Sequence, residues 1–106
     1  MTYVSFKISN GYIIGFDISG HSTAYADDIE GKLVCAAVSS AAYMAANTLT
    51  EILKAEADIH IDDARMKFML KSDPHICQVC LEGFKLHLSQ LANQYKNNLK
   101  VITEVL

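Results

Sequence analysis

Two side chains in the first third of the chain have the types needed for nucleophilic catalysis. Cys35 carries a thiol, and His21, fourteen residues before it, carries an imidazole. A thiol attacks a carbonyl as its thiolate, and a nearby imidazole can take the proton. The pair therefore predicts acyl transfer by a cysteine nucleophile with a histidine base. A small cysteine packed in a core would give the same pattern, so the two residues alone leave both interpretations open.

A polar loop that begins at Gly20 and ends at Gly31 joins these two side chains. The glycines would allow close approach of backbone and substrate, and movement of the loop. The part from Ser22 to Glu30 is the suspected substrate-binding segment. Three carboxylates lie near its end: Asp27, Asp28 and Glu30. They either orient His21 as a third catalytic group or cap the following helix, whose start favours anionic side chains.

An alanine-rich run predicts a helix from about Lys32 to Ala55, because alanine is the strongest helix former. Cys35 would then lie in the first turn or so. There the positive end of the helix dipole stabilises an anion, and free backbone N–H groups can hold an oxyanion. Apolar side chains occupy most of the circumference up to Met44, so the helix is expected to be largely buried.

Alternation of apolar and polar side chains predicts two strands before this helix. Asn10-Gly11 between them suits the positive backbone angles of a tight hairpin turn. The inward faces are expected to carry Thr2, Val4, Phe6 and Ile8, and then Tyr12, Ile14, Phe16 and Ile18. A second hairpin is expected to turn near Asp62-Asp63, with Ile59 and Ile61 before the turn and Met66, Phe68 and Leu70 after it.

The remaining residues predict a second helix and a last strand. Asp73-Pro74 opens the helix, since proline is tolerated in a first turn, and Asn97-Asn98 ends it. Its apolar stripe is Cys77, Cys80, Leu81, Phe84, Leu88, Leu91 and Tyr95. The last strand carries Leu99, Val101, Thr103 and Val105. The order ββαββαβ predicts an α+β fold, with two helices packed on one face of a mostly antiparallel five-stranded sheet.

Length and composition limit the function further. A chain of 106 residues fits a single domain over 1–106, and its net charge of −3 disfavours direct nucleic-acid binding. No stretch of about 18 apolar residues is found, so no membrane span is expected. The first four residues lack the features of a secretory signal, which predicts a cytoplasmic location. Three cysteines in such a chain argue against a disulfide framework.

The segment from His75 to Cys80, followed by His87, has the composition of a zinc motif, in which cysteines two residues apart act with histidines. Cys77 and Cys80 also fall on the apolar stripe of the second helix, so core packing explains the same spacing. A redox pair is disfavoured because no βαβ unit precedes the motif. We therefore expect no metal and no cofactor. His60, on a strand, is expected to face solvent.

Around the thiol and the imidazole the sequence resembles the ribosomal-processing cysteine proteases called Prp. The matching segments are Ile18-Ser19-Gly20-His21 and Leu33-Val34-Cys35-Ala36-Ala37-Val38-Ser39-Ser40. The chain length and the element order agree as well. The resemblance implies that Cys35 is the nucleophile and that His21 is the general base and acid of a reaction through an acyl-enzyme.

The resemblance also implies a substrate and an assembly. Family members remove a short N-terminal extension from large-subunit ribosomal protein L-twenty-seven, and the cut follows a hydrophobic stretch that ends in paired phenylalanines. A ribosomal-protein precursor peptide is therefore the implied partner, and a homodimer the implied assembly. Loop 22–31 would close over the peptide, and Tyr25 either contacts it or is simply a surface tyrosine.

Two further positions follow from the resemblance. A recurrent serine of the family maps onto Ser39, about one helical turn after Cys35. Its hydroxyl either positions the thiol or helix, or bonds back to a helix carbonyl. Lys32 stands where many members carry an aspartate. This departure leaves the role of that acid open, although a nearby cation would still favour a thiolate.

The sequence thus predicts a Prp-like endopeptidase that acts on a ribosomal-protein precursor. Two other hypotheses stand beside it. One is a non-catalytic module of the same fold that binds ribosomal proteins, and the other is a metal-binding or redox protein that uses Cys77 and Cys80. The combination of Gly20-His21 with Cys35 favours the protease.

Overall fold

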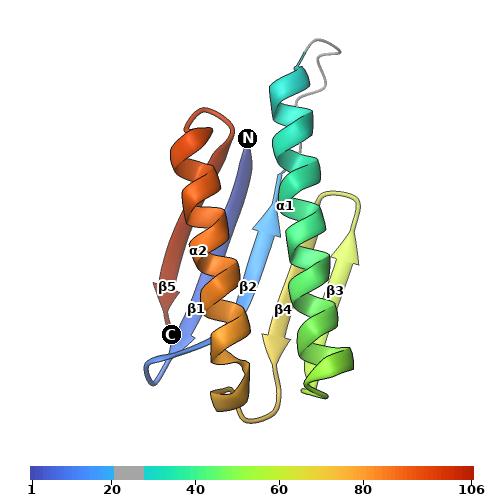
Figure 1. Cartoon of the computed structure of the whole chain (residues 1–106), viewed down its shortest axis with the longest axis vertical. Helices are drawn as coiled ribbons and strands as arrows, with labels where there is room; N and C mark the ends of the chain where they lie inside the picture. The colour runs from blue at the N-terminus through green and yellow to red at the C-terminus, as the bar shows by residue number, and fades with distance from the viewer. Residues whose placement is uncertain (21–27) are drawn as a thin grey trace.

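The computed structural model describes residues 1–20 and 28–106. Its elements follow the order ββαββαβ, and Figure 1 shows both helices on one face of a single sheet. The predicted fold class is therefore confirmed. The elements are β1 (Thr2–Ser9), β2 (Tyr12–Ser19), α1 (Ile29–Asn47), β3 (Ala57–Asp62), β4 (Arg65–Leu70), α2 (Gln78–Gln94) and β5 (Leu99–Val105). A π-helical turn (Thr48–Ile52) prolongs α1, and a 3-10 turn (His75–Cys77) leads into α2.

The sheet has the strand order β3-β4-β2-β1-β5. Pairing is antiparallel between β1 and β2, β2 and β4, and β3 and β4, whereas β5 runs parallel to β1. The sheet is thus mixed, because the chain crosses over through α2 before it returns as β5. This order leaves β3 and β5 as the edge strands and brings the β3–β4 hairpin beside β2.

The β1–β2 hairpin turns at Asn10 and Gly11, whose φ angles of 53° and 81° fit the predicted turn. Its register shifts after Lys7, so that Ile14 is an extra, bulged residue on β2. Ile13 therefore points into the core, and the prediction that Tyr12 and Ile14 face inward is wrong. The side chain of Gln78, the first residue of α2, accepts a hydrogen bond from Ile13 N (2.9 Å) and donates one to Ile13 O (2.8 Å). These two bonds satisfy the backbone polar groups of Ile13 beside the bulge.

Helix α1 begins at Ile29, earlier than the sequence predicted. The Asp28 carboxylate accepts a hydrogen bond from Gly31 N (3.1 Å), and the Asp28 carbonyl accepts one from Lys32 N (3.2 Å). The first bond satisfies an N–H group that the first turn of a helix leaves unpaired, and the second is the first backbone bond of the helix itself. Cys35 is consequently the seventh residue of the helix, in its second turn, whereas the predicted start near Lys32 placed it in the first turn or so.

Only one face of α1 is buried. That face carries Val34, Val38, Ala42, Ala45 and Ala46, and the small side chains allow close approach to the sheet. On the outer face Leu33 and Met44 are 66% and 73% exposed, so the expectation of a largely buried helix is wrong. By length and composition alone, Ile29–Ile52 is long and apolar enough to cross a membrane, a property that core helices of other folds share. In this fold the apolar inner face packs on the sheet.

Aromatic packing joins the sheet to α2. Phe16 stacks on Phe68 with ring centroids 5.0 Å apart, and Phe84 of α2 meets Phe16 and Phe6 edge-on at 4.9 and 5.5 Å. Such pairs contribute beyond the area that they bury. The predicted stripe is confirmed, since four of its residues are buried. These are Cys77 in the turn before α2, and Leu81, Phe84 and Leu88 in α2 itself.

Candidate active site

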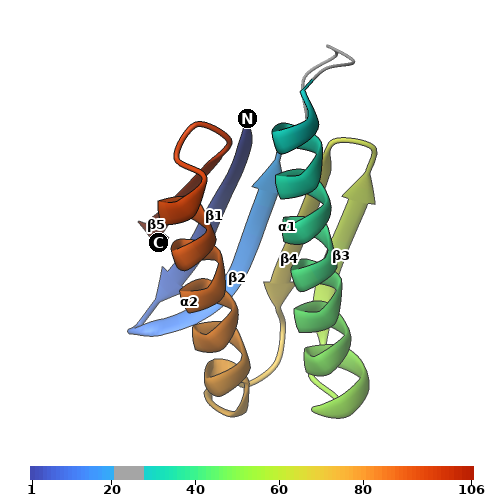
Figure 2. The same ribbon diagram turned by 45° about the horizontal axis from the view of Figure 1, so that its top comes forward.

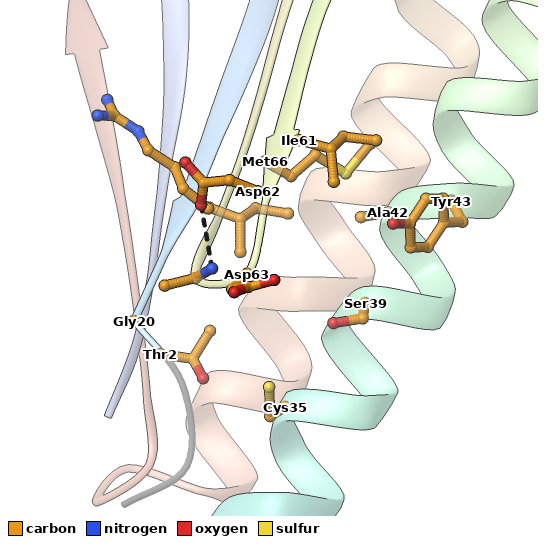
Figure 3. A pocket seen from close by; sticks show the side chains of 13 residues that line it. Thr2, Gly20, Cys35, Ser39, Ala42, Tyr43, Ile61, Asp62, Asp63 and Met66 are labelled. Atoms are coloured by element: carbon orange, nitrogen blue, oxygen red, sulfur yellow. Dashed lines mark hydrogen bonds between the residues drawn. The ribbon is translucent and has the colours of Figure 1, made fainter.

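A pocket of about 170 Å³ opens between α1 and the tip of the β3–β4 hairpin. Side chains on successive turns of α1 form one wall, namely Cys35, Ser39 and Tyr43. The floor is apolar and consists of Ile18, Ala42 and Met66, all buried. The rim is formed by Thr2, Gly20 and the hairpin residues 61–65. Figure 3 shows the Cys35 thiol facing this space.

The direction of the Cys35 side chain follows from helix geometry. Val34, Val38 and Ala42 face the sheet, and a helix turns by about 100° per residue. Cys35 therefore flanks the buried face on one side, whereas Ala41 and Met44 flank it on the other, in a groove shared with α2. Figure 2 shows α1 on the side of β3 and β4, and α2 on the side of β1 and β5. The thiol flank of α1 thus faces the β3–β4 hairpin.

Cys35 is partly buried and forms no disulfide. Its place in the second turn changes one prediction about its chemistry. In the second turn a backbone N–H is engaged within the helix, and the helix dipole acts mainly within the first turn. The start of α1, capped by Asp28, is therefore not available to Cys35 as an oxyanion hole. Donors for an oxyanion have to come from elsewhere around the pocket.

His21 lies outside the described residues, as do Ser22 to Asp27 and therefore Tyr25 and Asp27. Gly20, the residue bonded to His21, lines the same pocket as Cys35. Gly20 has a φ of +83°, and a β-carbon there would collide with the carbonyl oxygen of Met1. Glycine tolerates this φ angle and carries no β-carbon, so it is the residue that fits at this position.

The local structure also explains why glycine occupies position 31. A β-carbon at this position would collide with the Asp28 carboxylate, which caps the helix through Gly31 N. Of the two roles considered for the acidic residues, the structure shows capping for Asp28. Glu30 is exposed in the first turn of α1, where its charge also suits the helix dipole.

Ser39 lies one turn beyond Cys35 on the same flank of α1 and lines the pocket, as its spacing predicted. Its hydroxyl makes no hydrogen bond with the described part of the chain. By contrast, Thr48 and Thr50 bond back to the carbonyls of the residues four before them, at 2.7 and 2.9 Å. Back-bonding to a helix carbonyl is therefore not what holds Ser39.

The hairpin rim is one part of the pocket that sequence reasoning missed. Arg65 donates from Nε to Oδ1 of Asp17 (2.9 Å), which ties β4 to β2 beside the pocket. The hydrogen bond and charge of Arg65 lower the pKa of Asp17, against the opposing effect of burial. Asp62 Oδ1 accepts from Ala64 N (3.0 Å) and shapes the turn. The sequence predicted the turn, but only the strand order places it opposite Cys35.

The cysteines of the zinc-like motif pack in the core. Cys77 is fully buried, and Cys80 Sγ donates a weak hydrogen bond to Ala45 O at 3.9 Å. Burial raises the pKa of both thiols, which disfavours the thiolate form. Across residues 1–20 and 28–106 no three His, Cys, Asp or Glu side chains cluster as metal ligands. His60 is exposed, as expected, and lies 3.8 Å from the Asp62 carboxylate.

The fold and the pocket together define an α+β domain that presents one partly buried thiol beside an apolar cavity. The chain belongs to the cysteine protease Prp family, whose model matches residues 1–100. It is therefore an enzyme, a cysteine protease, and the hypothesis of a non-catalytic module is set aside. The sequence matches no curated protein.

Solved structures share the whole fold at low sequence identity. SMU.848 from Streptococcus mutans superposes with a TM-score of 0.88 at 20% identity, over 100% of this chain and 96% of that one. Two structures of the essential ribosomal processing protease Prp from S. aureus cover 98% of this chain and 100% of their own. The one with a covalently linked product peptide has a TM-score of 0.82 at 18% identity, and the one with a substrate peptide 0.85 at 16%.

Proposed function

We propose that this protease removes a short hydrophobic N-terminal extension from the precursor of ribosomal protein L-twenty-seven. The observation that carries the proposal is the Cys35 thiol in a pocket with an apolar floor, whose rim includes Gly20, the residue bonded to His21. Cys35 is the nucleophile, and His21 is the general base and acid. The bound peptides in the two S. aureus structures support a peptide substrate.

The proposed reaction is acyl transfer in two steps. The Cys35 thiolate attacks the scissile carbonyl carbon, an S–C bond forms, and the carbonyl electron pair moves to oxygen. When that pair returns, the C–N bond breaks and the amine leaves with a proton from the His21 imidazolium. Water then gives a proton to His21 and attacks the thioester carbon. The S–C bond breaks, and the acid product and the thiolate are released.

The size of the pocket limits how the substrate engages it. At about 170 Å³ it is smaller than the roughly 300–1,000 Å³ of pockets that enclose drug-sized ligands. It therefore suits a single side chain of an extended peptide. Its buried floor of Ile18, Ala42 and Met66 favours an apolar side chain, and Ile61 and Tyr43 extend that surface outward. A phenylalanine next to the scissile bond meets these requirements.

The proposal includes a homodimer in the cytoplasm. Support for self-association comes from the outer faces of the helices, where Val79 and Leu86 of α2 and Met44 of α1 are exposed apolar residues. A groove of about 680 Å³ lies between α1 and α2, lined in part by Met44 and Val79. Exposed apolar surface of this kind is typical of interfaces between protein chains.

The test uses a synthetic peptide that carries a hydrophobic extension ending in Phe-Phe, with products identified by mass spectrometry. The parent protein is expected to cut after the paired phenylalanines, and Cys35→Ala and His21→Ala are expected to be inactive. Cys80→Ala is the matched control, because it removes a partly buried thiol that lies outside the pocket. Cleavage by Cys35→Ala at the parent rate would disprove the assignment of the nucleophile.

A further inference from the structure

The Cys35 pocket requires a hydrogen-bond donor that α1 does not supply. Attack on a peptide carbonyl creates a negatively charged oxygen, and enzymes stabilise it with donors held in place beforehand. Cys35 lies in the second turn of α1, where backbone N–H groups are already engaged within the helix. Other polar groups around the pocket are therefore the candidates.

Thr2, the first residue of β1, is such a group. Its backbone is fixed, because Thr2 N donates to Asn98 O at 2.9 Å and the residue pairs with Leu99 of β5. The residue is only 3% exposed and is the one buried polar residue in the part of the chain that the structure describes. It also lines the pocket together with Cys35 and Ser39.

The Thr2 hydroxyl lacks a hydrogen-bond partner among residues 1–20 and 28–106. Asn98 Oδ1 is the side-chain polar atom in these residues that is enclosed without a partner, so the unbonded Thr2 hydroxyl is open to the pocket that Thr2 lines, where a bound molecule can pair with it. Figure 3 shows Thr2 across the pocket from Cys35, with the hydroxyl at the end of the side chain on the side of Cys35. The position is sheltered from solvent, and a hydrogen bond to a developing charge is strongest where water is excluded.

We propose that the Thr2 hydroxyl donates a hydrogen bond to the scissile carbonyl oxygen as it becomes an oxyanion. This inference rests on the function proposed above and adds a catalytic group to it. When Cys35 Sγ bonds to the carbonyl carbon, the displaced electron pair resides on the oxygen that Thr2 contacts. The hydroxyl keeps its proton throughout, so that His21 alone carries protons between the groups that react.

The experiment compares the parent with Thr2→Val, which removes the hydroxyl but keeps the shape, and with Thr2→Ser, which keeps the hydroxyl. Loss of one oxyanion donor lowers kcat by about 10²–10³-fold. We expect a loss of this size in Thr2→Val with little change in KM, and activity within about tenfold of the parent in Thr2→Ser. The rate at which iodoacetamide alkylates Cys35 should be equal in all three proteins, because the reaction forms no oxyanion. Thermal unfolding establishes that each variant is folded.

The alternative outcomes separate this inference from the proposed function. Equal peptide cleavage by the parent and Thr2→Val overturns the role of Thr2 and leaves the protease assignment intact. An equal loss in Thr2→Val and Thr2→Ser, or slower alkylation in Thr2→Val, also overturns it, since packing then explains the effect. A folded parent that leaves the peptide uncut overturns the proposed function, and the role of Thr2 with it.

Discussion

Replacement of Gly31 by alanine tests how the helix that carries Cys35 begins. Two opposite effects act at this position. Alanine is favoured over glycine in a helix by up to about 1 kcal/mol. Its β-carbon, however, would occupy the place of the Asp28 carboxylate, which caps α1 through Gly31 N. Loss of such a cap costs about 0.5–2 kcal/mol.

The two effects separate in a double-mutant cycle. In the parent, Gly31→Ala should change the free energy of unfolding by an amount between a gain of about 0.5 and a loss of about 1 kcal/mol. In the Asp28→Ala background there is no carboxylate to displace. There the same replacement should stabilise the protein by up to about 1 kcal/mol. The expected coupling between the two positions is therefore about 0.5–2 kcal/mol.

The assay is urea or thermal unfolding of the four proteins, followed by circular dichroism. For a domain of about this size, 1 kcal/mol corresponds to roughly 4–8 °C in the midpoint temperature, so the coupling is measurable. An identical effect of Gly31→Ala in both backgrounds would refute the reasoning. It would mean that the Asp28 carboxylate can cap α1 even when residue 31 carries a side chain.

Three further predictions concern the substrate, the pH dependence and the assembly. Ile61→Ala should raise KM for the hydrophobic peptide several-fold, whereas Ile59→Ala, on the same strand but outside the pocket, should leave it unchanged. The pKa of Asp17 is lowered, so its pairing with Arg65 stabilises the fold fully at pH values above the usual pKa of a carboxyl group. This stabilisation is lost as the pH falls through the lowered pKa. Asp17→Asn should therefore unfold with a weaker pH dependence in acid, measured by urea titrations at several pH values. Val79→Glu, at a residue 88% exposed, should shift the sedimentation mass toward the monomer and leave the midpoint temperature within a few degrees of the parent.

Local patterns in the sequence predicted much of the fold. The alternation in β1, the Asn10-Gly11 turn and the stripe of α2 are short-range signals, and the structure confirms each of them. The bulge at Ile14 was not predictable in this way, because one extra residue reverses the inward and outward faces beyond it. The amide of Gln78 that completes this bulge is 65 residues away from Ile13 along the chain.

The candidate site was predictable only in part. Residue types and the family resemblance pointed to Cys35 and Ser39, and helix periodicity placed both on one flank. The start of α1 was misjudged because Asp28 was an open alternative between cap and catalytic group. Thr2 and the hairpin rim were missed since their approach to Cys35 depends on strand order, which no local pattern encodes.

The pocket draws on segments that are far apart along the chain. Thr2 and Gly20 come from the beginning, Cys35 and Ser39 from the first helix, and residues 61–66 from the second hairpin. Thr2 is in turn held by Asn98 and by the last strand, β5. A nascent or partly unfolded chain therefore exposes a thiol but has no assembled binding site around it. Proteolytic competence arises only with the completed fold, which protects other proteins from this nucleophile during its own synthesis.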